Sequence, residues 1–306
     1  MGKIFDAMQK AIATPAKQTG VQAKATAPTP IIETDKNSRE TVDSLRLKPP
    51  ADGSDVTERS FQLLPMNELL VTCRQDGGQD ASFAAEQYKM LCSQIMFPGD
   101  RSVPRTIMVT SAIPGEGKSV VASNLAISIA LGKNEHVLLI EADLRRPSLA
   151  KLFGLKNSRG LSDYLLEDGQ LSHLLSQTRV DKLTLLPAGK LPRNPYELLS
   201  SERMKRLLEE VRNRYDDRYV ILDCTPAQVA AETRVLSKFI DGIILVVRYG
   251  KTSRKLIQET VGKVGKEMFL GVVFNGLEDR DMYSYQHYYK YYGHTQKKRL
   301  GLFRQN

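Results

Sequence analysis

The sequence predicts an α/β fold, in which a doubly wound, mostly parallel sheet follows a largely disordered N-terminal extension. From about residue 80 onward, six continuous apolar runs alternate with amphipathic segments. Apolar runs without polar alternation are typical of strands that are covered on both faces, as in parallel sheets. A glycine-rich segment directly follows the first run, and such sheets bind ligands at the carboxyl ends of their strands. We therefore expect the functional site at that edge.

The N-terminal extension has two predicted parts. KIFDAMQKAIA places four apolar side chains on one helical face, so residues 1–13 are predicted to form a short amphipathic helix. This helix would either dock a partner or cap its own domain. Residues 14–79 are polar and punctuated by proline, which predicts a flexible linker. Within it, residues 59–72 are candidates for one or two short strands.

Residues 80–279 are predicted to form a single α/β domain. Its strands are expected at 105–112, 136–143, 183–189, 219–225, 242–248 and 270–276. Amphipathic helices are expected between them, at 118–132, 197–215 and 252–267.

Composition limits the class of protein. Of the 306 residues, 41% are hydrophobic and 26% are charged, as in ordinary globular proteins. No apolar run is long enough to span a membrane, and the N-terminus lacks a secretory signal. Three cysteines without a CxxC pair favour a reducing compartment and no structural metal, so a cytoplasmic location is expected. The net charge of +9 is concentrated near the C-terminus, which favours either a solvated tail or an anionic partner.

The segment SAIPGEGKS lies between a strand and a helix, which is the context that a phosphate-binding P-loop requires. Its two glycines let backbone N–H groups turn toward phosphate oxygens. Lys118 is expected to bind the β- and γ-phosphates of a nucleotide, and the Ser119 hydroxyl to bind Mg²⁺. Ala112 stands where the GxxxxGK[ST] pattern has its first glycine. The predicted nucleotide-binding residues of this P-loop NTPase-type fold are Pro114, Gly115, Glu116, Gly117, Lys118, Ser119 and Val120.

Acidic residues end two further predicted strands. Glu141 and Asp143 follow one apolar run, and Asp223 ends another. Each acid alone could cap a helix, but three of them beside a P-loop favour a site. Mg²⁺ is expected to be held by Ser119, Asp143 and Asp223, directly or through waters. Arg145 would either stabilise the transferring phosphoryl group or pair with an acid.

Five features together make the chain resemble the bacterial tyrosine kinases (BY-kinases), which are P-loop autokinases that govern polysaccharide export. The resemblance covers roughly residues 80 to 293. The features are SAIPGEGKS, VLLIEADLRRP, LPAGKLPRNPYELLSSERMKRLLEE, YVILDCTP and a tyrosine-rich C-terminal tail. The start, GKIFDAMQKA, is similar to the exosortase-associated branch of the family.

The resemblance implies an ATP- and Mg²⁺-dependent enzyme that phosphorylates tyrosines in its own C-terminal tail, typically on a neighbouring subunit. It implies the catalytic residues Lys118, Glu141, Asp143 and Arg145, with the acid at 141 helping to accept the phenol proton. The family usually has Asp at this position, so Glu141 is a departure. The early helix of the family tends to carry Glu and two Arg for ring assembly, whereas this chain has Glu86, Lys89 and Cys92. Ring formation by that route is therefore less secure.

The resemblance also implies partners. These are further copies of the chain in a homo-oligomer, a separate membrane-bound activator of the chain-length-determinant type, and a cognate tyrosine phosphatase. Nucleic acid is not expected to bind. The protein would be recruited to the inner face of the cell membrane.

Residues 280–306 form the predicted tyrosine-rich and basic tail. YSYQHYYKYYGH contains half of the chain's 12 tyrosines. The expected autophosphorylation sites are Tyr283, Tyr285, Tyr288, Tyr289, Tyr291 and Tyr292. A tyrosine-rich packing segment is the alternative. Asn275, at the end of the last strand, is expected either to contact adenine or to form a turn.

Two other functions remain open from the residues. A partitioning or positioning ATPase of the related P-loop group would carry a lysine at the second position of the P-loop motif, where this chain has Ile113. A nucleotide sensor without phosphotransfer is the second alternative, and Glu141 is the feature that keeps it open. Phosphotyrosine formed in the presence of Mg·ATP would distinguish the kinase from both.

Overall fold

The computed structural model describes residue 70 and residues 79–155, 159–167, 170–214 and 218–277. The predicted helix at 1–13 and the predicted tail at 280–306 lie outside the described residues. The same holds for the predicted linker and its candidate strands, apart from residue 70 and the last residue of the linker.

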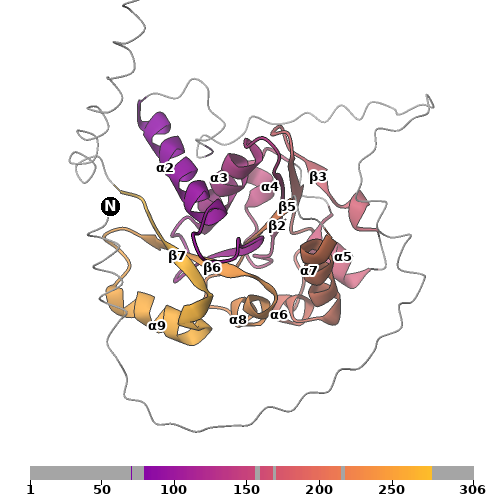
Figure 1. The fold of residues 1–306 in the computed structure, drawn as a ribbon. Coiled ribbons are helices and arrows are strands. Elements are labelled where there is room, and N and C mark those ends of the chain that lie inside the picture. Colours follow the sequence, from indigo (N-terminus) through magenta and orange to yellow (C-terminus); the bar gives the residue numbers. More distant parts are fainter. Residues whose placement is uncertain (1–69, 71–78, 156–158, 168–169, 215–217, 278–306) are drawn as a thin grey trace, which may run out of the picture. The chain divides into compact units, whose positions relative to one another are not determined.

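A seven-stranded sheet lies at the centre of the described domain (Figure 1). Its order is β3-β4-β2-β5-β1-β6-β7, and all neighbouring strands are parallel except β3, which is antiparallel to β4. The strands are β1 (Thr106–Ser111), β2 (His136–Glu141), β3 (Ser176–Gln177), β4 (Leu183–Leu186), β5 (Arg218–Asp223), β6 (Gly242–Arg248) and β7 (Phe269–Asn275). The predicted doubly wound sheet is confirmed, and all six predicted strands are present. The two-residue β3 is too short to give a pattern in the sequence.

Eight α-helices are described around the sheet. They are α2 (Gln79–Met96), α3 (Lys118–Ala130), α4 (Leu149–Leu152), α5 (Leu161–Leu166), α6 (Pro195–Leu199), α7 (Glu202–Arg214), α8 (Glu232–Leu236) and α9 (Arg254–Val264). Short 3-10 turns occur at Leu171–His173, Ser237–Phe239 and Lys266–Met268.

One predicted helix is in fact two. Residues 197–215 were expected to be continuous, but α6 ends at Leu199 and α7 begins at Glu202. Each helix has its own N-terminal signal. Asn194 accepts a hydrogen bond from Glu197 N at 3.4 Å at the start of α6, and Ser201 Oγ accepts one from Met204 N at 3.2 Å at the start of α7. Ser201 caps α7 and so separates it from α6. The apolar periodicity continues across this break, which is why it predicted one helix.

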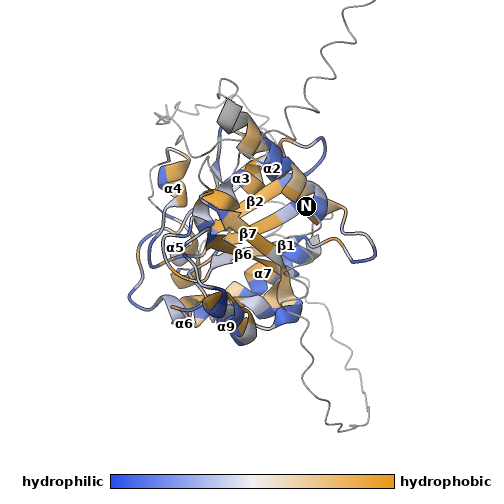
Figure 2. Ribbon diagram, turned by 90° about the vertical axis from the view of Figure 1, so that its left-hand side faces the viewer, coloured by the Kyte–Doolittle hydropathy of each residue, from blue (hydrophilic) through white to orange (hydrophobic). Residues whose placement is uncertain are grey.

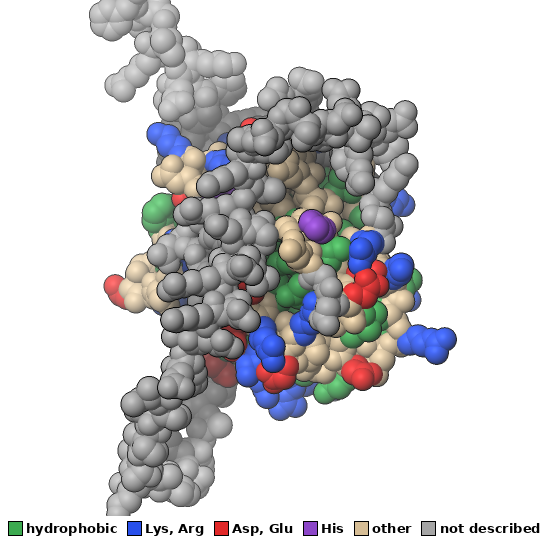
Figure 3. All heavy atoms as spheres, turned by 90° about the vertical axis from the view of Figure 1, so that its right-hand side faces the viewer, with side chains coloured by type: hydrophobic (Ala, Val, Ile, Leu, Met, Phe, Trp, Pro, Cys, Tyr) green, Lys and Arg blue, Asp and Glu red, His purple; other side chains and the backbone are tan. Residues whose placement is uncertain are grey.

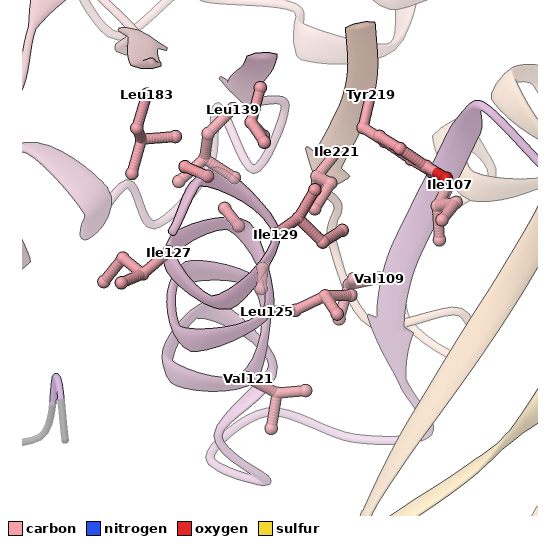
Figure 4. Packing of buried hydrophobic residues seen from close by; sticks show 14 of the residues in the cluster. Ile107, Val109, Val121, Leu125, Ile127, Ile129, Leu139, Leu183, Tyr219 and Ile221 are labelled. Atoms are coloured by element: carbon pink, nitrogen blue, oxygen red, sulfur yellow. The ribbon is translucent and has the colours of Figure 1, made fainter. Parts of the chain in front are cut away.

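The core lies on both faces of the sheet. Successive strand residues alternate between two clusters, so Ile107 and Val109 pack with α2, α3 and α4, whereas Met108 packs with the helices α5 to α8 on the other face. Figure 4 shows Leu125 and Ile129 of α3 directed toward Val109 and Ile221 of the strands. In Figure 2 the strands at the centre are coloured mostly hydrophobic, whereas the helices around them mix hydrophobic and hydrophilic residues. Coverage on both faces explains the continuous apolar runs.

The surface beside α5 and α7 carries charges of both signs. Figure 3 shows acidic and basic side chains interspersed there, with apolar side chains between them. One ion pair in α7 joins Lys205 and Glu202 at 3.6 Å. Exposed pairs of this kind contribute little to stability, so the stability of the domain depends mainly on the two buried clusters.

Candidate active site

The loop between β1 and α3 depends on two glycines in the left-handed backbone region. Their φ angles are +83° at Gly115 and +91° at Gly117. A Cβ added at Gly117 would lie 2.0 Å from Asn275 Nδ2, so a larger residue would displace the loop or the asparagine. The helix begins at Lys118, which places its unpaired N–H groups and the positive end of its dipole at the end of the loop. Loop and helix together have the features of an anion-binding site.

Lys118 lies where the loop meets two other strand ends. Its Nζ is 2.8 Å from Asp143 Oδ2 and 3.5 Å from Asp223 Oδ1, and it also lies 3.1 Å from Ser119 Oγ. Burial lowers the pKa of Lys118, but the two carboxylates outweigh that effect and leave the pKa above its ordinary value. The lysine therefore stays protonated between two acids. Four of the residues predicted from the sequence come together here.

Asp223 at the end of β5 is fully buried, and within the described residues neither of its oxygens accepts a hydrogen bond of regular geometry, although the Lys118 ammonium, 3.5 Å from Oδ1, and the Ser119 hydroxyl favour its charged form. Burial raises its pKa, and the Lys118 ammonium opposes that rise. A buried carboxylate without such bonds is costly unless a cation supplements its interactions. The oxygens of Asp223 and the neighbouring Ser119 hydroxyl are ligands of the kind that Mg²⁺ prefers, so these residues fit the predicted metal.

Asp143 lies just beyond the end of β2 and is held in place by its own loop. Its Oδ1 accepts a hydrogen bond from Arg146 N at 3.1 Å, and its Oδ2 faces Lys118. Arg145 in the same loop pairs with an acid, which was one of the two roles predicted for it. Its Nε and Nη2 both contact Glu232 Oε1, at 3.0 and 2.6 Å. The second oxygen of the buried Glu232 has no described hydrogen-bond partner.

Glu141 makes contacts quite different from those of Asp143. Its side chain is buried, and its Oε1 accepts hydrogen bonds from Ser148 N and from Leu149 N, the latter at 2.6 Å. Its Oε2 accepts one from Ala188 N at 3.2 Å. Burial raises the pKa of Glu141, and the three backbone N–H groups oppose the rise. Residues two apart in a strand point to the same side, but β2 ends at Glu141, so this alternation does not extend to Asp143.

The P-loop is also hydrogen-bonded to residues at and just after the carboxyl ends of β6 and β7. The side chain of Glu116 is buried and accepts hydrogen bonds from Ile113 N at 2.9 Å, from Arg248 N at 3.2 Å and from the Thr252 hydroxyl. Asn275 Nδ2 donates to the carbonyl of Glu116 at 2.8 Å. Contact between Asn275 and adenine remains a prediction. The hydrogen bond from its amide group holds the P-loop in place. The ends of β6 and β7 therefore buttress the phosphate loop, a role that no motif in the sequence indicated.

Replacing Glu116 with Ala is expected to weaken nucleotide binding about tenfold, because the loop loses the acceptor for two backbone N–H groups. Titration with a fluorescent ATP analogue measures the change in Kd. Glu202→Ala in α7 is the matched control, because this exposed acid pairs with Lys205 in its own helix. An unchanged Kd for Glu116→Ala would show that the buttress does not set the loop's affinity.

The remaining predicted site residues fall into two groups. Pro114 and Gly115 are exposed on the loop, and Val120 is half-buried in the first turn of α3. The six predicted substrate tyrosines lie outside the described residues. The chain leaves the described domain at Leu277, two residues after the asparagine that contacts the P-loop.

Comparison with known proteins agrees with this geometry. Residues 104–266 match the AAA domain family AAA_31. The chain is 36% identical over 197 residues to the tyrosine-protein kinase YwqD of Bacillus subtilis, covering 64% of this chain and 82% of that one. It is 33% identical over 215 residues to the tyrosine-protein kinase CpsD of Streptococcus pneumoniae, covering 69% of this chain and 92% of the relative.

Solved structures extend the likeness to three dimensions. The kinase domain of Escherichia coli tyrosine kinase ETK superposes with a TM-score of 0.61 at 28% identity, covering 70% of this chain and 88% of the other. The chimerical protein CapA2B2 gives a TM-score of 0.61 at 29% identity, covering 70% of this chain and 95% of the other. With its P-loop lysine set between two strand-end carboxylates, this chain belongs to the bacterial tyrosine kinases.

Proposed function

We propose that this tyrosine kinase transfers the γ-phosphoryl group of Mg·ATP to the tyrosines of its own C-terminal tail, on a neighbouring copy of the chain. The observation that carries the proposal is the position of Lys118 Nζ, 2.8 Å from Asp143 and 3.5 Å from Asp223 at the end of a glycine loop. Phosphoryl transfer depends on positioning and on charge stabilisation, and these residues supply both.

Each residue has a defined task in this proposal. Lys118 exchanges its carboxylate partners for oxygens of the β- and γ-phosphates, and the loop N–H groups bind the same phosphates. Ser119, Asp143 and Asp223 hold Mg²⁺, which when bound neutralises phosphate charge. The Arg145 side chain is 46% exposed while it pairs with Glu232, so it is available to a phosphoryl group after a change of partner.

The tail has the reach for transfer to a neighbour. From Asn275 to Tyr288 is thirteen residues, which extend to roughly 43 Å. The domain is about 45 Å across for a chain of its length. Each phosphate adds about −1.5 to −2 charges, so several would reverse the charge of a basic tail and weaken contacts between subunits.

The proposal includes a cellular setting that follows from the resemblance. Within the residues that the structure describes, no helix combines the length and the apolar content needed to cross a bilayer. A separate membrane-bound activator would recruit the kinase to the inner face of the cell membrane, and a cognate phosphatase would reverse the modification. The cycle would regulate exopolysaccharide synthesis and export.

Mass spectrometry tests the tail as substrate. The full chain, incubated with Mg·ATP and the cytoplasmic segment of a candidate activator, is expected to gain phosphate on the cluster from Tyr283 to Tyr292. Release of free phosphate without modified tyrosine would favour an ATPase, and binding without either product would favour a nucleotide sensor.

Mixing two full-length variants tests transfer between copies. One chain carries an intact P-loop with its six tail tyrosines changed to Phe, and the other carries Lys118→Met with its tail intact. Phosphotyrosine on the second chain is expected. If neither chain of the mixture gains phosphotyrosine while the wild-type chain alone does, transfer occurs within one copy.

A further inference from the structure

Glu141 joins two loops at the carboxyl edge of the sheet. Through Ser148 N and Leu149 N it binds the start of α4, which follows the loop that carries Asp143 and Arg145. Through Ala188 N it binds the segment that leaves β4. The three backbone donors come from positions up to 47 residues away in the chain. One carboxylate therefore spans the space between two separate segments.

The segment after β4 is itself anchored to α5. Leu161 N donates to the Pro187 carbonyl at 2.8 Å, and Ser162 N donates to the Ala188 carbonyl at 2.9 Å. A Cβ added at Gly160 would lie 2.0 Å from the Pro187 oxygen, which shows how closely the two backbones approach. Glu141 thus ties the loop of Asp143 to a fixed part of the domain.

The same contacts leave Glu141 poorly placed for proton transfer. A general base has to come within hydrogen-bonding distance of the proton that it takes, about 2.6–3.2 Å between heavy atoms. The Glu141 side chain is 0% exposed, and both of its oxygens already accept backbone hydrogen bonds. Because the carboxylate is buried between the two segments, a phenol could reach it only if the segments moved apart. Asp143, by contrast, faces Lys118 at the phosphate site.

We propose that Glu141 is a positioning residue, which holds the loop of Asp143 and Arg145 against the segment that leaves β4, and that it does not accept the phenol proton. Its length is the specific feature. An aspartate is shorter by one methylene and would not reach Leu149 N and Ala188 N together. The inference rests on the proposed transfer to tail tyrosines only for its activity readout.

Two substitutions separate positioning from proton acceptance, because they change length and charge independently. Glu141→Gln keeps the length and one acceptor oxygen, which serves Ser148 N and Leu149 N, and it loses only the 3.2 Å bond from Ala188 N, because its amide nitrogen cannot accept. Glu141→Asp keeps the carboxylate but loses the reach. We expect the Gln variant to retain kcat within about tenfold of wild type, and the Asp variant to lose at least about tenfold. The Kd for Mg·ATP is expected to change less than threefold in both, because the P-loop contacts remain.

Hydrogen–deuterium exchange gives a readout that is independent of catalysis. In the apo Asp variant, peptides covering 144–150 and 186–190 are expected to exchange faster than in wild type, whereas P-loop peptides are not. Glu135→Gln, at the opposite end of β2, is the matched control and should leave exchange in both peptides unchanged. All rates are measured well below the melting temperature of every variant, so that loss of folded protein does not contribute.

Two results for the Glu141 variants would overturn the proposed positioning role. A general base contributes about 10²–10⁴-fold, so a folded Gln variant that loses more than 100-fold in kcat overturns the proposal. An Asp variant with wild-type kcat and wild-type exchange also overturns it, and this decides the question if the Gln variant does not fold. If the wild type forms no phosphotyrosine in its tail, the proposed substrate is wrong, while the exchange data still test the position of Glu141.

Discussion

Replacing Lys118 with Met is expected to lower the rate of tyrosine phosphorylation by about 10³-fold or more, since one charged donor to a transition state contributes about 10²–10³ in kcat and this lysine also binds the ground-state phosphates. Methionine nearly matches the length and volume of the lysine stem but carries no charge. Phosphotyrosine on intact protein, quantified by mass spectrometry against time at saturating Mg·ATP, measures the effect.

The same substitution has a consequence for stability with a defined pH dependence. Lys118 opposes the rise in the pKa of Asp223 that burial causes, so its removal raises that pKa further. A buried acid with a raised pKa contributes stability when protonated and loses it as pH rises through the folded-state pKa. Apo Lys118→Met is therefore expected to fall further below wild type in Tm as pH rises above the unfolded-state pKa of an aspartate.

Lys205→Met in α7 controls for the loss of a lysine, because its ammonium is 3.6 Å from Glu202 and lies in another element. It should keep wild-type phosphorylation. Phosphotyrosine formed by Lys118→Met at near wild-type rate would refute the assignment of the P-loop as the source of the phosphoryl group.

Sequence patterns predicted the elements that depend on neighbouring residues. The P-loop, the strand ends at Asp223 and Glu141 and the covered sheet all follow from local spacing or from runs of apolar residues. What the sequence did not indicate are contacts between distant segments. Glu116 accepts from Arg248 N across 132 residues, and Arg145 reaches Glu232 across 87. The Arg248 N–H carries no motif, because a backbone N–H is the same at every non-proline residue, and Glu232 lies outside the motifs that the sequence showed.

The role of residue 141 illustrates that limit. The resemblance implied an acid at position 141 that takes part in catalysis, whereas the carboxylate that the structure brings to the P-loop lysine from this segment is that of Asp143. Glu141 instead accepts hydrogen bonds from backbone N–H groups at the start of α4 and just after the end of β4. The local sequence shows which acids follow a strand. The contacts of each acid depend on loops from distant parts of the chain, and these contacts determine the role of each carboxylate.

Asp223→Asn is the second substitution with a large expected effect, and its two effects have opposite signs. Phosphorylation is expected to fall by about 10²–10³-fold, because the proposed Mg²⁺ site loses its one fully buried carboxylate. The apo protein is expected to become more stable by about 1 kcal/mol, or roughly 2–4 °C in Tm. Wild type buries two acids against one lysine, and within the described residues neither oxygen of Asp223 accepts a hydrogen bond of regular geometry.

The pH dependence of the stability gain follows from the direction of the pKa shift. Since burial raises the pKa of Asp223, its charged form costs stability, and that cost appears as pH rises above the unfolded-state value toward the folded-state pKa. The advantage of the Asn variant should therefore grow with pH and shrink in acid, where wild-type Asp223 is protonated. Calorimetry of both apo proteins across this range measures it.

Asp241 provides a matched control at the opposite edge of the same sheet. Its Oδ2 accepts hydrogen bonds from Arg105 N at 2.9 Å and from Thr106 N at 2.8 Å, and its Oδ1 pairs with Arg212 at 3.2 Å. Here the charge is satisfied, so Asp241→Asn should lower Tm and leave the phosphorylation rate of the folded protein unchanged. If both Asn variants lose stability alike, Asp223 is satisfied in the apo protein, and its burial does not carry the cost in stability that we assign to it. If Asp223→Asn gains stability yet keeps full activity, the metal lies elsewhere.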